Sequence, residues 1–213
     1  MKTPADPDAR PAISRNVSRV VPDVTALKAL AHPVRLRMLG MLRIDGPATA
    51  TELAVRLGLN SGATSYHLRQ LAQYGFIEDA PGPSRRDRRW RASHEITSVP
   101  AAESEGEAFD MDVAFTQAAL SLQVSLMQKA VEEYAELPLA WRRASAANDI
   151  VIPLTPAQAE ALTGRLNDIV MEAMAAAPPL GKPLPADMVP FSVMLHAFPY
   201  PGRVPHGEDG NEP

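Results

Sequence analysis

Five arginines lie within seven residues of one another in the first half of the chain, at positions Arg85, Arg86, Arg88, Arg89 and Arg91. A guanidinium group binds phosphate oxygens in pairs and also enters narrow minor grooves of DNA. The sequence Pro-Gly-Pro-Ser directly before them, residues 81–84, is a turn signal. We therefore predict a hairpin of two strands, residues 76–80 and 88–92, in which Trp90 faces the protein interior and the arginines bind nucleic-acid phosphates.

Small and polar side chains open a helix that we predict just upstream of this hairpin. A helix that enters the major groove of DNA needs short side chains at its start, so that its backbone approaches the bases, and hydrogen-bonding groups on the same face. Ala63 suits a thymine methyl group, and Ser61 and Ser65 suit bases or phosphates. The residues that we expect to contact DNA from this helix are Asn60, Ser61, Gly62, Ala63, Ser65, Tyr66 and Arg69.

Capping signals divide the region around these residues into four short helices. Thr49 and Glu52 have the spacing of a capping box at the start of one helix, and Gly58 suits its left-handed end. Pro33 suits the first turn of an earlier helix. The predicted helices span residues 23–32, 33–43, 49–58 and 60–74. Two helices joined by a tight turn and followed by a basic hairpin predict a winged helix-turn-helix.

The net charge of −4 hides an uneven distribution along the chain. Residues 27–93 hold eleven Lys and Arg against five Asp and Glu, a net charge of +6. The rest of the chain holds ten basic and twenty acidic residues, a net charge of −10. A basic module joined to acidic surroundings is the balance expected of a DNA-binding domain within a larger protein.

The residue types required for catalysis or metal binding do not form any recognisable pattern. The chain has no cysteine, so disulfides, thiolate metal sites and cysteine nucleophiles are excluded. Among the five histidines, we expect His32 and His67 to be hydrogen-bonded structural groups. The sequence has no glycine-rich phosphate loop, nucleophile elbow or acid–base pair. It therefore predicts neither an enzyme nor a metal or cofactor site.

The two ends of the chain have no apolar targeting or anchoring pattern. The N-terminus lacks the apolar segment of a secretion signal, and no run of about 18 apolar residues could span a membrane. Residues 1–22 hold prolines and several small or charged residues with no apolar period, and residues 202–213 are rich in Gly, Pro and charged residues, which predicts flexible tails. We therefore expect a cytoplasmic protein without a membrane partner.

The longest predicted helix, from about residue 109 to residue 137, carries two apolar stripes. The first stripe consists of Val113, Leu120, Val124, Met127, Val131 and Tyr134. The second, which includes Phe115 and Leu122, lies about 140° away around the helix axis. A helix that exposes one face to solvent shows only one apolar stripe. We therefore predict that the second stripe packs on the winged helix of the same chain and that the first forms a homodimer interface.

The C-terminal part is predicted to form a small β-α-β unit. Residues 149–152 and 189–198 have the apolar content or alternation of strands, and Thr155 and Gln158 cap a helix between them that runs to about residue 175. The predicted fold is mainly α, within the α+β class. Its predicted parts are a flexible tail (1–22), a winged helix-turn-helix (23–95), a linker (96–107), a dimerisation helix (108–147), a β-α-β region (148–201) and a second tail (202–213).

Three segments of the chain resemble winged-helix regulators of the ArsR/SmtB family, in particular its larger members with an extra C-terminal region. They are ALAHPVRLRML at 29–39, TELA at 51–54 and ATSYHLRQLAQYGFIE at 63–78. The resemblance covers about residues 25–93. It implies a homodimer that binds an operator, in which residues 61–69 read bases and residues 85–91 form the wing. Metal-sensing members use cysteines before the turn or a carboxylate–histidine set on the dimer helix, and this chain has neither.

These observations together predict a sequence-specific DNA-binding transcriptional regulator, a homodimeric repressor that binds an inverted-repeat operator in double-stranded DNA. A small-molecule effector, if the protein has one, would bind between the dimerisation helix and the C-terminal region. The alternative is a winged-helix module that binds a protein partner without sequence-specific DNA binding. The arginine-rich hairpin and the small residues of the predicted recognition helix argue against that alternative.

Overall fold

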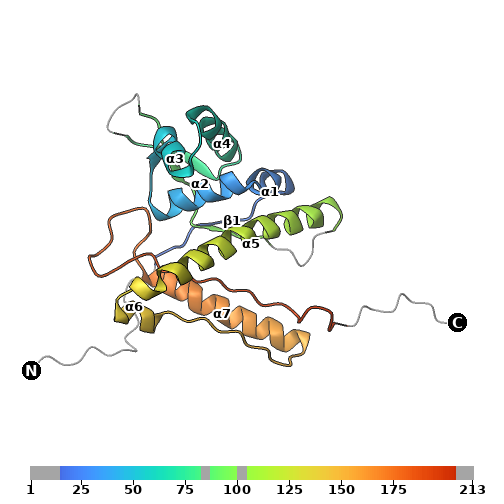
Figure 1. Cartoon of the computed structure of the whole chain (residues 1–213). Helices are drawn as coiled ribbons and strands as arrows, with labels where there is room; N and C mark the ends of the chain where they lie inside the picture. Colours follow the sequence, from blue (N-terminus) through green and yellow to red (C-terminus); the bar gives the residue numbers. More distant parts are fainter. Residues whose placement is uncertain (1–14, 83–86, 100–104, 205–213) are drawn as a thin grey trace, which may run out of the picture.

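The computed structural model describes residues 15–82, 87–99 and 105–204 of the chain. Its helices are α1 (Val24–Leu30), α2 (Pro33–Ile44), α3 (Ala50–Leu57), α4 (Ser61–Gln73), α5 (Glu107–Glu133), the 3-10 helix η2 (Tyr134–Glu136), α6 (Leu139–Ala144) and α7 (Pro156–Ala176). We use the word head for residues 19–97, which hold α1 to α4. The head lies on one side of the long helix α5, and α7 lies on the other side (Figure 1).

Two small sheets complete the head. The first has the strand order β2 (Ala48–Thr49), β4 (Arg89–Ala92), β3 (Ile77–Ala80), and its neighbouring strands are antiparallel. The second pairs β1 (Arg19–Val20) in parallel with β5 (Ile96–Thr97). The hairpin of β3 and β4 is the wing, and it confirms the predicted hairpin to within one residue at the start of each strand.

Local caps explain why the head helices begin and end where the sequence predicts. The Asp23 side chain accepts a hydrogen bond from the Ala26 N–H at 2.8 Å at the start of α1. The Thr49 hydroxyl accepts one from the Glu52 N–H at 3.1 Å, and the Glu52 carboxylate accepts one from the Thr49 N–H at 2.7 Å. Gly58 ends α3 with a φ of 65°, a left-handed conformation that suits glycine. The predicted capping box and helix ends are therefore confirmed.

The hydrophobic core of the head connects the helices to the wing. Leu30, Met38, Leu53 and Leu68 come from four different helices and are all fully buried. Trp90 of β4 joins this cluster and is only 5 % exposed, which confirms its predicted place in the interior. Burial of one such side chain contributes about 1.5–3 kcal/mol to folding. The shared core therefore fixes α4 and the wing relative to each other.

The long helix predicted over about residues 109–137 is found as α5 and η2, and the rest of the predicted dimerisation segment, up to residue 147, contains the separate short helix α6. α5 ends at Glu133 and is followed by η2, and Leu137 then adopts an extended conformation before α6 begins. Pro138 explains the break, because proline lacks a backbone N–H and disfavours helical geometry in the residue before it. Phe115, from the second apolar stripe of α5, packs against the core of the head. This stripe therefore meets the head of the same chain in its N-terminal half.

The strands predicted for the C-terminal β-α-β unit are wrong. α7 begins with the predicted capping box of Thr155 and Gln158, but residues 145–204 contain no strand. Residues 189–198 instead run without regular structure and meet α5, where Nε2 of His196 lies 2.8 Å from Oε1 of Gln123. Alternating apolar residues form a strand only where a neighbouring strand supplies hydrogen bonds. None of the described strands of this chain pairs with these segments.

Residues 15–22 are held against the rest of the chain, so the predicted flexible tail is wrong for these residues. β1 pairs with β5, and the Ser18 N–H donates a hydrogen bond to the Glu95 carboxylate at 3.1 Å. The same pairing makes residues 96–97 a strand where a linker was predicted. These partners are 77 positions apart in sequence, so no local pattern indicates that they pair. The predicted tails over 1–14 and 205–213, and the linker residues 100–104, lie outside the described residues.

Candidate DNA-binding surface

The helix α4 buries one face and presents the other to solvent. Thr64 and Leu68 are fully buried on the inner face, whereas Tyr66 is 53 % exposed on the outer one. α4 lies in the part of the head far from α7 (Figure 1). The outer face brings together residues that the sequence analysis predicts to contact DNA, namely the exposed Ser61, Gly62, Tyr66 and Arg69, with the half-buried Ala63 and Ser65 at its edges.

Asn60 builds the start of α4. Its side-chain oxygen accepts a hydrogen bond from the Ala63 N–H at 2.8 Å, and its backbone oxygen accepts one from the Thr64 hydroxyl at 3.0 Å. An N-cap of this kind stabilises a helix by about 1 kcal/mol. Asn60 therefore positions the small residues of the first turn. The sequence alone does not distinguish this capping role from the predicted contact with DNA.

Each wing arginine that lies within the described residues forms an ion pair inside the head. The pairs are Arg88 with Asp79, Arg89 with Glu52 at 2.9 Å, and Arg91 with Glu78 at 2.7 Å. Arg88 also lies 4.0 Å from the centre of the Trp90 ring. The predicted contacts Arg85 and Arg86 lie outside the described residues. Sequence reasoning missed the acidic partners, although Glu78 lies directly opposite Arg91 in the hairpin, where unlike charges attract.

Three partners in these ion pairs, Asp79, Arg88 and Glu52, have pKa values shifted toward their charged forms. The hydrogen bonds from Arg88 hold the pKa of Asp79 below its usual range and raise the pKa of Arg88. The Thr49 N–H and then the charge of Arg89 lower the pKa of Glu52. The side chains of Arg88 and Asp79 are both 60 % exposed, so water and salt compete with the pair. A phosphate of DNA can therefore replace the carboxylate as the partner of the guanidinium.

The two histidines predicted to be structural lie together where α2 meets α4. Their ring centres are 4.7 Å apart, and Nδ1 of His32 accepts a hydrogen bond from the Val34 N–H at 3.1 Å, which confirms the structural role of His32. Burial, followed by the charge of Arg35, lowers the pKa of His32. Burial, followed by the charges of His32 and Arg35, lowers the pKa of His67. Both shifts favour the neutral form of the ring, and Nδ1 of His67 is buried without a hydrogen-bond partner in the described part of the chain, so the hydrogen bond predicted for His67 is not found at this atom.

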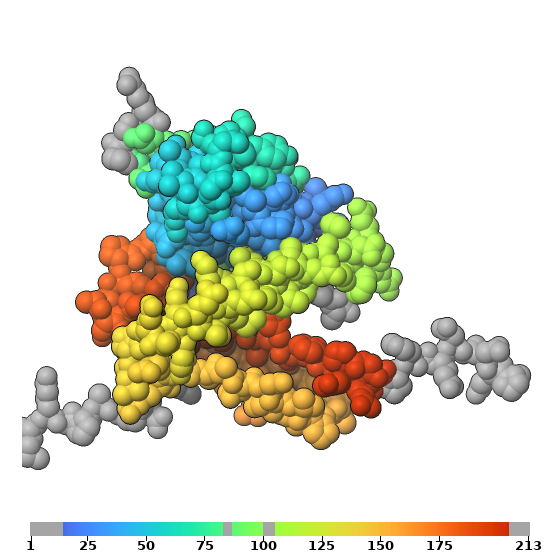
Figure 2. Space-filling model, viewed as in Figure 1, coloured from blue at the N-terminus to red at the C-terminus, as the bar shows by residue number. Residues whose placement is uncertain are grey.

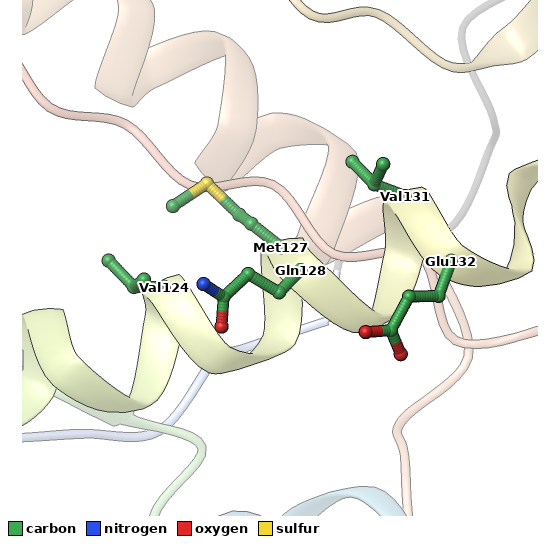
Figure 3. A pocket seen from close by; sticks show the side chains of 5 residues that line it. All are labelled: Val124, Met127, Gln128, Val131 and Glu132. Carbon is green, nitrogen blue, oxygen red and sulfur yellow. The ribbon is translucent and has the colours of Figure 1, made fainter.

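The residues predicted to form the dimer interface are all exposed, five of them on α5 and Tyr134 at the start of η2. Their exposed fractions run from 39 % at Val113 to 76 % at Val131. Figure 3 shows an open depression on this helix that is lined by Val124, Met127, Gln128, Val131 and Glu132. In the single chain, the first apolar stripe of α5 is therefore an apolar surface open to solvent, and Leu120 and Tyr134 extend it along the helix.

The described residues contain no group of three or more His, Asp or Glu that could hold a metal ion. Within the same ranges, each helix is too short or too polar to cross a lipid bilayer. The head carries two sets of groups that could bind DNA, the hydrogen-bonding face of α4 and the guanidinium groups of the wing.

Residues 30–80 match a family model described as a helix-turn-helix domain. The matched segment holds α2, α3 and α4 and ends with β3 of the wing. No curated protein is significantly similar to the chain. The domain match and the arrangement of α3, α4 and the wing identify a winged helix-turn-helix, and they support a DNA-binding transcriptional regulator.

Several solved structures are also similar to the chain. Reduced HlyU from Vibrio cholerae is 28 % identical over 41 % of this chain and 78 % of its own, with a TM-score of 0.29. The homodimeric winged helix-turn-helix domain of Mb0332 from Mycobacterium bovis, a possible ArsR-family regulator, is 22 % identical over 52 % and 79 %, with a TM-score of 0.31. The repressor BigR from Xylella fastidiosa is 22 % identical over 46 % and 83 %, with a TM-score of 0.30. Because these TM-scores are low, the three structures carry no argument about the function of this chain.

Proposed function

We propose that the chain is a homodimeric, sequence-specific repressor of transcription, in which α4 enters the DNA major groove and the wing contacts the flanking backbone. The observation that carries this proposal is the outer face of α4. It is solvent-exposed, begins with small side chains and carries hydrogen-bonding groups, while its inner face is fixed by the core of the head. A helix held in this way can approach base edges closely.

Individual residues on α4 and the wing have distinct roles in this proposal. Ser61 and Ser65 donate or accept hydrogen bonds at bases or phosphates near the start of α4. Arg69, two turns further along, binds a guanine through its two acceptor atoms, a contact worth about 1–3 kcal/mol of discrimination. Arg88 and Arg89 bind phosphates and supply affinity that does not depend on sequence.

The exposed stripe of α5 supports a homodimer. Large apolar side chains that are 39–76 % exposed along one helix face form an apolar patch, and such a patch is usually buried in a protein–protein interface. A two-fold pairing of α5 would present two α4 helices roughly 34 Å apart, the separation of successive major grooves on one side of a duplex. The operator would then be an inverted repeat. The resemblance to the ArsR/SmtB family supports the same assembly and a repressor role, and an effector would bind between α5 and the C-terminal region.

The purified chain should be tested first on the promoter fragment upstream of its own gene, against a scrambled duplex of equal length and composition. We expect selective binding to the promoter and an affinity that falls by several decades over a modest rise in salt, as about eight phosphate contacts per dimer would require. Arg88→Ala combined with Arg89→Ala should weaken binding to both duplexes.

Equal and weak binding to the two duplexes would contradict the proposal for this promoter. Selection from genomic fragments would then show whether another site is bound. If no fragment is selected, the alternative of a winged-helix module that binds a protein partner is favoured.

A further inference from the structure

The loop that follows α7 returns to the head and docks on the turn between α2 and β2. The Gly181 N–H donates a hydrogen bond to the Ile44 carbonyl at 3.2 Å. Gly46 and Gly181 pack backbone against backbone, since a Cβ added to Gly46 would lie 2.4 Å from the Gly181 oxygen. A Cβ on Gly181 would lie 3.0 Å from the Gly46 Cα. Both glycines have positive φ, so neither position suits another residue.

The turn that receives this loop is connected to both α3 and the wing. Asp45 pairs with Arg56 of α3. The Pro47 carbonyl accepts a hydrogen bond from the Arg89 guanidinium at 3.2 Å. Residues 45–47 therefore lie between the C-terminal loop on one side and two parts of the winged helix on the other (Figure 1).

A second attachment holds the end of α7 near the same face of the head. The Arg15 N–H donates to the Ala175 carbonyl at 3.0 Å, and the Arg15 Nε donates to the Ala177 carbonyl at 2.8 Å. The same guanidinium pairs with Glu95, directly before β5, at 2.7 Å. The C-terminal end of α7 is thus tied to the head at two separate places.

The rest of α7 is held loosely. None of its residues is buried, and Ile169 is 62 % exposed. Figure 2 shows α7 and the C-terminal segment as a layer beneath α5. The loop that connects α7 to this segment reaches up toward the head. An element with few buried contacts opens at low free energy. α7 can therefore shift at low free energy, and the attachments at its C-terminal end pass the shift toward the head.

We propose that the packing of Gly181 on Gly46 couples the C-terminal region to the winged helix, so that a displacement of α7 moves the turn 45–47 and, with it, α3 and the wing. The turn is a small rigid body because it is bonded on three sides, and packed backbones transmit a shift rather than absorb it. The inference rests on this packing and does not require that the head binds DNA.

Hydrogen–deuterium exchange of the full chain without DNA tests the coupling in both directions. Gly181→Ala should speed exchange across the contact, in residues 44–57, as well as in its own loop. Gly46→Ala should speed exchange in residues 177–185. The matched controls are Gly202→Ala and Gly75→Ala, at positive-φ glycines whose added Cβ would meet no atom within 4 Å. Each control should change exchange only near its own position.

The coupling is disproved if Gly181→Ala speeds exchange only in residues 177–185, or if Gly202→Ala speeds exchange in residues 44–57 to the same degree. Gly46 is in the head, where an added Cβ could prevent folding. Gly181 lies outside the core of the head, so Gly181→Ala still decides the question. Because no DNA is present, a failure of the proposed DNA binding would leave this result unaffected.

Discussion

The guanidinium of Arg88 holds both carboxylate oxygens of Asp79, with the Nη2–Oδ2 distance at 2.9 Å, while it lies 4.0 Å from the centre of the Trp90 ring. A carboxylate on β3 and a ring on β4 thus fix the orientation of one wing arginine. The pair is open to solvent, so a phosphate of DNA could compete for the guanidinium. If the wing contacts DNA as proposed, its affinity depends on how readily its carboxylates release their arginines.

Asp79→Asn should raise the affinity for DNA by about three- to tenfold at low salt, because it frees Arg88 and removes a negative charge that repels phosphate. The melting temperature should change little, since exposed ion pairs add little stability. Asp87→Asn is the matched control, as it removes the same charge from the same hairpin without opening the Arg88–Asp79 pair. An equal rise in affinity for both variants, measured by titration of a labelled duplex, would show that the pair itself has no role.

Val131→Glu should convert the proposed homodimer to a monomer. Val131 is 76 % exposed on the first apolar stripe of α5, and a carboxylate there would be buried without a partner in the dimer, which costs several kcal/mol. Val55→Glu on α3 is the control, because Val55 is 78 % exposed in the single chain and lies outside the stripe. Light scattering after size-exclusion chromatography measures both masses. A dimeric Val131→Glu variant would place the interface elsewhere.

The stability of the N-terminal attachment should depend on pH through Glu95. Burial alone would raise the pKa of Glu95, but hydrogen bonds from Arg15 and the Ser18 N–H outweigh burial and hold the pKa below its ordinary value of 4.5. The carboxylate therefore adds stability that is complete above the unfolded-state pKa and is lost as the pH falls through the lower folded-state pKa.

Glu95→Gln should accordingly lower the free energy of unfolding by about 1 kcal/mol at pH 7, since the pair is partly exposed. The difference from the wild type should shrink steadily as the pH falls below 4.5. Urea denaturation at several pH values measures it. A difference that stays the same from neutral to acidic pH would mean that the charge of Glu95 does not stabilise the fold.

The winged helix could be predicted from sequence because its signals are local. The Thr49 and Glu52 capping box and Gly58 after α3 each act within a few residues, and each is found as predicted. The outer face of α4 follows from helical periodicity in the same way. To predict the ion pair between Glu78 and Arg91 in the wing, the register of the hairpin is also needed, because it places these two residues opposite each other.

The remaining parts depend on contacts between distant segments. The pairing of β1 with β5 and the packing of Gly181 on Gly46 join residues far apart in the chain, and no periodic pattern marks them. The alternation of apolar residues near Phe191 is a true pattern, but a strand also needs a partner, which the described strands do not provide. Instead, the Phe191 ring lies 6.4 Å from that of Trp141 in α6.

The central claim, that α4 reads bases, is tested most directly by measuring the affinity of the wild type and Arg69→Ala for the operator and for each of its single-base-pair variants. Arg89→Ala is the control for a phosphate contact. We predict that Arg69→Ala loses about 1–3 kcal/mol of discrimination at particular base pairs and keeps it elsewhere. Arg89→Ala should weaken every duplex alike and reduce the salt slope by about one. A uniform loss of affinity on Arg69→Ala, with discrimination unchanged at every base pair, would contradict the account.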